Sequence, residues 1–173
     1  MSKIYFLKFK IISRIILFIA LISSYAVSSQ TFTDSNLPIV IITTDLDSNN
    51  QPLPILDDPK ILASMKVIKH PDGSRNYLSD ANNNAFLNYN GRIGIEIRGS
   101  SSQTLPKKGY GLTTLKADNT SNNNVSLLGM PSENDWILNS FAFDPPLIRD
   151  YISYNISRQM GNYAPRTVYC EVV

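Results

Sequence analysis

A polar loop carries the residue types in this 173-residue chain that are best suited to chemistry. It runs from Arg98 to Lys108 and reads RGSSSQTLPKK. Gly99 can adopt backbone angles closed to other residues, and hydroxyl, backbone N–H and ammonium groups together can bind a phosphate. The spacing Gly-x-x-x-x-Gly-Lys-Ser/Thr is absent, which excludes a Walker A loop. The alternative is a polar hairpin connection followed by a solvated lysine pair. The candidate phosphate ligands are Arg98, Ser100, Ser101, Lys107 and Lys108.

Two strands are predicted to hold this loop. Before it, Ile93, Ile95 and Ile97 alternate with more polar residues or glycine, the period-2 pattern of a strand with one buried face. After it, residues 109–115 (GYGLTTL) read as the return strand of a hairpin. Further strands are predicted near residues 38–43, 62–69, 135–139 and 165–173, which are rich in β-branched and apolar residues.

One amphipathic helix is predicted over residues 145–160. Asp144 is typical of the residue that caps a helix, and Pro145 of the first position inside it. Gly161 can end the helix in a left-handed conformation. Apolar residues recur at three- and four-residue spacing and form one stripe, namely Leu147, Ile148, Tyr151, Ile152, Ile156 and Met160. The residues off this stripe are interpreted as a solvated face, namely Arg149, Asp150 and Arg158. The fold class is therefore α+β, a mostly antiparallel sheet packed by one main helix.

Two further groups of residues invite a metal or acid–base interpretation. Residues 45–50 place Asp45, Asp47 and Asn49 where a calcium loop has its first ligands. However, asparagine stands where that loop needs glycine and leucine where it needs glutamate, so a plain turn is favoured. His70, the only histidine, opens the turn-forming run HPDGS, which favours a hairpin. With no matching ligand nearby in the sequence, it is interpreted as a turn residue.

The first 29 residues read as a secretory signal peptide. They contain four basic and no acidic residues, an apolar run at 15–22 and then small residues before a cut in front of Gln30, with a cut after Ser28 as the alternative. The alternative, an uncleaved anchor, is disfavoured because a spanning helix needs about 20 apolar residues. The prediction is a secreted or cell-surface protein with no transmembrane segment after cleavage. Removing the leader leaves 12 basic and 14 acidic residues, which gives no support for nucleic-acid binding. The single cysteine, Cys170, excludes a disulfide within the chain.

Several segments together resemble the CotH kinase family, named for a bacterial spore-coat protein. Residues 95–112 (IEIRGSSSQTLPKKGYGL) are similar to the family's strand, Arg-Gly-x-Ser-Ser loop and Pro-Lys-Lys-x-Tyr return. Residues 127–173 match its Leu-Leu-Gly-Met-Pro, Asp-Trp-x-Leu, Asp-x-x-x-x-Arg and Met-Gly-x-x-Ala-Pro elements in order. Residues 37–42 look like the strand that opens the domain, so the resemblance covers roughly residues 37–173.

The resemblance implies a secreted domain of atypical protein-kinase fold that transfers phosphate from ATP, with a divalent metal expected to be Mg²⁺, to serine or threonine of a protein. The family's catalytic and metal-binding carboxylates lie downstream of Val173, so no residue here is assigned to catalysis or to metal. Residues 30–36 are then a lead-in, and residues 37–173 a partial domain, truncated at its C-terminus and inactive as a fragment. The alternatives are a non-catalytic domain for surface assembly or adhesion, and a polypeptide that does not fold alone.

Overall fold

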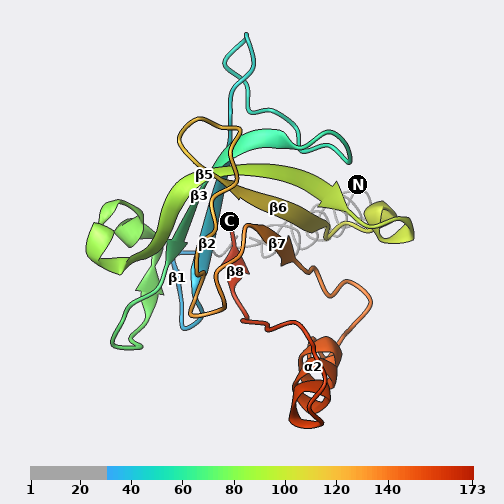
Figure 1. The fold of residues 1–173 in the computed structure, drawn as a ribbon. Helices are drawn as coiled ribbons and strands as arrows, with labels where there is room; N and C mark the ends of the chain where they lie inside the picture. The colour runs from blue at the N-terminus through green and yellow to red at the C-terminus, as the bar shows by residue number, and fades with distance from the viewer. Residues whose placement is uncertain (1–30) are drawn as a thin grey trace, which may run out of the picture. The chain divides into compact units, whose positions relative to one another are not determined.

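Six strands form one sheet in the computed structural model, which describes residues 31–173 (Figure 1). In spatial order they run β7-β6-β5-β3-β2-β8, and every pair is antiparallel except β2 and β8, which are parallel. The predicted α+β class with a mostly antiparallel sheet is confirmed. The strands are β2 (Ile39–Thr44), β3 (Ile61–Ile68), β5 (Leu87–Arg98), β6 (Gly109–Leu115), β7 (Asp135–Leu138) and β8 (Glu171–Val172).

Two of the sequence predictions about strands were wrong in part. The last strand was expected over 165–173, but only β8 pairs, because residues 160–170 have irregular backbone. The HPDGS run does form a turn, with the N–H of Gly73 bonded to the carbonyl of His70 at 3.2 Å. It leads first to β4 (Asn76–Tyr77), which pairs with β1 (Asp34–Ser35) in a separate small sheet. The 3₁₀ helices η1 (Leu78–Asn82) and η2 (Asn84–Phe86) follow before β5 pairs with β3.

Around β5 the large sheet has one apolar face and one more polar face. On β5, Ile93 and Ile95 are fully buried and belong to the same core cluster as Met65 and Leu112 of the neighbouring strands. Glu96 and Arg92 alternate with these isoleucines and are partly exposed. The period-2 pattern thus places the main core cluster on one side of β5 and charged side chains on the other.

The single α-helix of the described region, α2 (Arg149–Gln159), begins later than predicted. Leu147 has a positive φ of 58°, which interrupts the helical backbone after Pro145. The residue at the N-cap is therefore Ile148 and not Asp144 as predicted, although Asp144 Oδ2 accepts a hydrogen bond from the N–H of Arg149, the first residue of the helix, at 3.0 Å. At the other end Gly161 has φ +84°, and its N–H and that of the next residue bond to the carbonyls of Arg158 and Ser157. This is a Schellman ending, as the glycine predicted.

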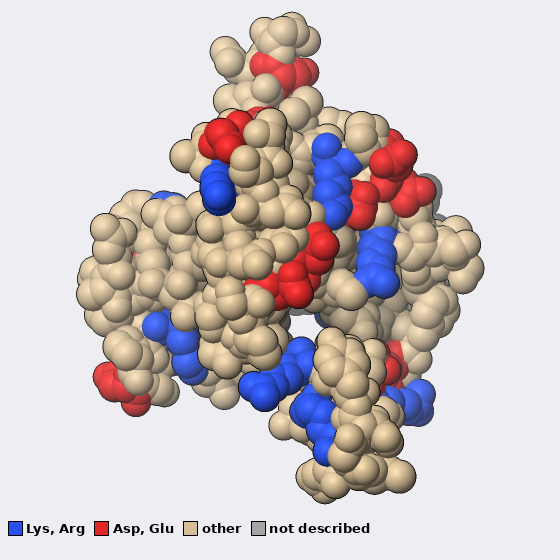
Figure 2. Space-filling model, viewed as in Figure 1, with Lys and Arg blue, Asp and Glu red and all other residues tan. Residues whose placement is uncertain are grey.

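The prediction that this helix packs on the sheet was wrong. No residue of α2 is buried, and its apolar stripe is exposed from Leu147 to Met160. Figure 1 shows the helix away from the strands, and in Figure 2 a gap passes between the segment with α2 and the rest of the surface. Polar contacts hold it to its flanking segments: Asn139 Nδ2 donates to Asp150 Oδ2 at 2.9 Å, and the guanidinium of Arg158 donates to the carbonyl of Pro165. Neither charged residue is simply solvated.

Candidate phosphate-binding hairpin

The candidate loop closes the hairpin of β5 and β6. Seven residue pairs define this hairpin, the last of them Arg98 opposite Gly109. Residues 99–108 connect the two strands and include the 3₁₀ helix η3 (Ser101–Thr104). The predicted hairpin is therefore confirmed, and all five candidate phosphate ligands lie at its tip or at the adjoining strand end.

Hydrogen bonds within the loop fix its shape. The N–H of Gln103 bonds to the carbonyl of Ser100 at 3.1 Å, and the Gln103 side-chain amide donates to the carbonyl of Gly99 and to Asp57 Oδ1, both at 2.6 Å. Gly99 has φ +117°, and a Cβ atom there would lie 2.1 Å from Ser102 Oγ. Glycine is therefore required at this position for two reasons, backbone conformation and space.

The five candidate residues differ in how far the protein already uses them. Arg98, Ser100, Ser101 and Lys107 are exposed, and within residues 31–173 their side chains make no hydrogen bond or ion pair with another residue. Lys108 is half-buried, and its ammonium group donates to the carbonyl of Gln103. Among the residues that the structure describes, the loop thus presents two unpaired cations and two hydroxyls to solvent, while Lys108 also stabilises the loop.

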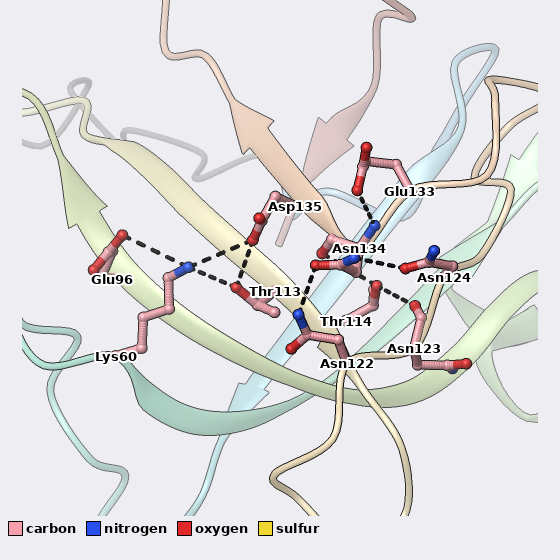
Figure 3. A network of polar contacts seen from close by, with 10 residues as sticks. All are labelled: Lys60, Glu96, Thr113, Thr114, Asn122, Asn123, Asn124, Glu133, Asn134 and Asp135. Carbon is pink, nitrogen blue, oxygen red and sulfur yellow. Dashed lines mark hydrogen bonds and ion pairs between the residues drawn. The ribbon is translucent and has the colours of Figure 1, made fainter.

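A second set of polar side chains, on the polar face of the same hairpin, was missed by the sequence analysis. Lys60 precedes β3, and its Nζ donates to Thr113 Oγ1 at 2.6 Å (Figure 3). Glu96 and Asp135 lie on either side, with carboxylate oxygens 3.8 Å and 3.9 Å from the same Nζ. We call these four residues the Lys60 cluster. The alternation on β5 predicts that Glu96 shares a face with Arg98, but no sequence signal points to Lys60.

Residues 95–173 match the family model described as CotH kinase protein. This stretch is CotH-like. The match confirms the resemblance for the hairpin tip, β6, β7, α2 and β8, which all fall inside it. No curated protein and no solved structure matches the chain.

The CotH-like stretch begins within β5, so β2, β3 and Lys60 come from outside it. The strand that enters the hairpin is nevertheless paired to β3, from Ile95 opposite Ile61 at the start of this stretch back to Leu87 opposite Ile68. The part of the chain before residue 95 therefore completes the sheet that supports the candidate loop. The predicted signal peptide, residues 1–29, lies outside the described residues, and no helix within the described residues is long and apolar enough to cross a membrane.

Residues 45–50, which resemble the start of a calcium loop, form a turn and an ion pair in the structure. Asp47 Oδ1 accepts the N–H groups of Asn49 and Gln51 at 2.7 Å and 2.9 Å, which makes a side-chain-stabilised turn as predicted. Asp45 pairs with Arg92 of β5, whose Nη1 lies 2.8 Å from Asp45 Oδ1. The hydrogen bonds from this guanidinium lower the pKa of Asp45. Both carboxylates are thus engaged by the protein itself.

His70 anchors its turn more firmly than the sequence suggested. Its Nε2 lies 2.8 Å from Asp80 Oδ2, a carboxylate that η1 brings close although it is ten residues away. Its Nδ1 lies 2.9 Å from Ser74 Oγ, and its ring stacks on Phe86 with centroids 3.8 Å apart. A buried ring with both nitrogens bonded and one face packed links β3 to η1 and η2, so the interpretation as a turn residue stands.

Proposed function

We propose that this chain is the nucleotide-binding portion of a CotH-type protein kinase, which transfers phosphate from ATP to serine or threonine of a protein. The observation that carries the proposal is the position of the CotH-like loop. It presents Arg98 and Lys107 to solvent at the end of a rigid hairpin, beside two exposed hydroxyls. Exposed cations at the tip of a hairpin suit the charge neutralisation that phosphoryl transfer requires.

The loop residues have distinct tasks in this proposal. Arg98 and Lys107 donate hydrogen bonds to phosphate oxygens, and the hydroxyls of Ser100 and Ser101 add two further donors. Lys108 holds the loop closed through the carbonyl of Gln103 and adds positive charge. Gly99 allows the backbone to turn at the end of β5 with no side chain in the way.

The resemblance also implies a divalent metal, which supplies charge neutralisation on the phosphates of bound ATP. Within residues 31–173 no three His, Cys, Asp or Glu side chains form a group able to hold a metal ion. This donor set does not fit a protein-bound metal. We therefore assign the loop residues to phosphate binding. We assign no metal-dependent step to any residue that the structure describes.

The test is ATP binding by the full chain, measured by isothermal titration calorimetry. Lys107→Glu with Lys108→Glu should weaken ATP binding at least tenfold, because a hydrogen bond to a charged group contributes about 1.5–3 kcal/mol. The matched control carries the same charge change away from the loop, with Lys69→Glu and Lys116→Glu, and should keep wild-type affinity. Equal affinities for the two double variants would remove the lysine pair from the site.

Two further outcomes separate the alternatives. Absence of phosphate transfer by this chain is expected under either alternative, since no residue here is assigned to catalysis, so ATP binding that depends on the loop separates the kinase portion from the non-catalytic surface-assembly domain. Absence of any ATP binding by the wild-type chain would refute the proposal. We also propose that the chain is exported, and mass spectrometry of the secreted product should then find Gln30 at its N-terminus.

A further inference from the structure

The Lys60 cluster lies next to the candidate loop on the same side of the hairpin. Glu96 and Arg98 are two residues apart on β5, so their side chains point to the same face. At about 3.3 Å per residue, their backbone positions are about 7 Å apart. Across the hairpin, Glu96 is opposite Gly111, and Gly94 is opposite Thr113. The cluster and the loop therefore form one continuous polar strip.

Hydrogen bonds join Lys60, Thr113 and Asp135 of this cluster, whereas Glu96 retains the capacity to accept one. Thr113 Oγ1 accepts from Lys60 and donates to Asp135 Oδ1 at 2.9 Å. The two carboxylates are too far from Lys60 for short hydrogen bonds, at 3.8 Å and 3.9 Å. Glu96 receives no hydrogen bond from any residue in the described part of the chain, and its side chain is 29% exposed. Glu96 is thus an acceptor that faces solvent.

Two glycines allow side chains of the cluster to lie directly on the backbone of the hairpin. A Cβ atom at Gly111 would lie 3.0 Å from Glu96 Oε1, so the carboxylate rests directly against the backbone of β6. A Cβ atom at Gly94 would lie 3.5 Å from Cβ of Lys60, so the lysine stem covers that glycine.

The charges along the strip change sign. The loop carries three cations, Arg98, Lys107 and Lys108, whereas the Lys60 cluster has one cation and two carboxylates. A second phosphate group would be repelled by the carboxylates, but a neutral group with hydroxyl donors would be attracted. A nucleoside triphosphate has this polarity, with anionic phosphates joined to a ribose that carries hydroxyls.

We propose that Glu96 binds a ribose hydroxyl of ATP and so orients the nucleotide along the hairpin, with its phosphates at the loop. Lys60 and Thr113 are positioning residues, which fix the carboxylates around the sugar. This inference rests on the proposed function, because it needs ATP at the loop. It goes further in assigning a sugar-binding role to residues of β5, β6 and the segment before β3.

The experiment compares four probes on the full chain by calorimetry: ATP, 2′-deoxy-ATP, 3′-deoxy-ATP and inorganic triphosphate. The wild-type chain should bind ATP about tenfold more tightly than at least one deoxy analogue, since a hydroxyl bound to a charged acceptor is lost. Glu96→Gln should reduce this preference to about twofold or less and leave triphosphate affinity unchanged. Glu133→Gln, an exposed isosteric control, should keep the full preference.

The outcomes distinguish the two proposals. If the wild-type chain binds ATP and both deoxy analogues equally, the ribose inference is overturned. The loop proposal stands in that case if Lys107→Glu with Lys108→Glu weakens ATP binding. An unchanged preference in Glu96→Gln, with a wild-type circular dichroism spectrum, overturns the role of Glu96. Failure of ATP and triphosphate alike to bind overturns the proposed function itself.

Discussion

Replacing Gly99 with alanine should destabilise the candidate loop more than any other glycine-to-alanine change in a turn of this protein. Its φ of +117° lies outside the regions that a residue with a side chain readily adopts. Such backbone strain costs of order 1–3 kcal/mol. The new Cβ would also lie 2.1 Å from Ser102 Oγ, so the serine must move. We expect a total loss of about 2–3 kcal/mol from strain and displacement together.

Two matched variants separate the contribution of backbone strain from that of the displaced serine. Gly73 also has a positive φ, +77°, but an added Cβ would meet nothing within 4 Å, so Gly73→Ala should cost only about 1 kcal/mol of strain. In Gly99→Ala with Ser102→Ala, the nearest Ser102 atom is Cβ at 3.5 Å, an ordinary contact. This double variant should recover about 1 kcal/mol of the loss, the part due to displacement.

The assay is urea unfolding followed by the fluorescence of Trp136, the only tryptophan, which lies on β7 beside the hairpin. With a urea dependence of about 2 kcal/mol per molar, Gly99→Ala should lower the midpoint by about 1–1.5 M. ATP affinity should fall in parallel if the loop binds phosphate. If Gly99→Ala costs no more than Gly73→Ala, or if the serine change recovers nothing, the described loop conformation is wrong.

Two further predictions concern the sheet. Ile95→Ala removes three fully buried carbon atoms and should lower the free energy of unfolding by about 3–4 kcal/mol. Ile137 is 59% exposed on the opposite face, so Ile137→Ala should lower it by less than about 1 kcal/mol. Similar losses for the two variants in urea unfolding would contradict the two-faced sheet. Asp45 has a lowered pKa because Arg92 bonds to it, so its contribution to stability is present above the unfolded pKa of about 3.9 and is lost as pH falls through the folded pKa. The wild-type chain should have a higher free energy of unfolding than Asp45→Asn, by less than about 1 kcal/mol because the pair is so exposed. This difference should shrink between pH 6 and pH 3. A difference that does not depend on pH would exclude the ion pair as its source.

The hairpin could be predicted from the sequence because its determinants are local. Period-2 alternation fixes which residues of β5 are buried, and the glycine and serine run fixes where the strand must turn. The ends of α2 were partly predictable for the same reason, since Gly161 ends it as expected. Its start was not, because the left-handed conformation of Leu147 leaves no trace in the residue type.

Contacts between residues far apart in the sequence could not be predicted from such local patterns. The apolar stripe of α2 indicates a face suited to burial but does not specify what covers it, and in this structure the sheet does not. Lys60 was missed because its partners come from three other strands, 36 to 75 residues further along the chain. Asp80 reaches His70 only because η1 folds back beside the turn. Each of these contacts depends on topology, which short patterns do not encode.

The fold and the candidate site share one determinant, the alternation along β5. Ile93 and Ile95 build the core from one face, while Glu96 and Arg98 form the polar strip on the other. A slip of one residue in the pairing with β3 or β6 would turn every side chain to the opposite face. Buried charges and exposed isoleucines would then cost far more than the sheet's marginal stability. The hydrophobic pattern that selects the register therefore also places Glu96 and Arg98 side by side, and any nucleotide site on this hairpin is specified as strictly as the core itself.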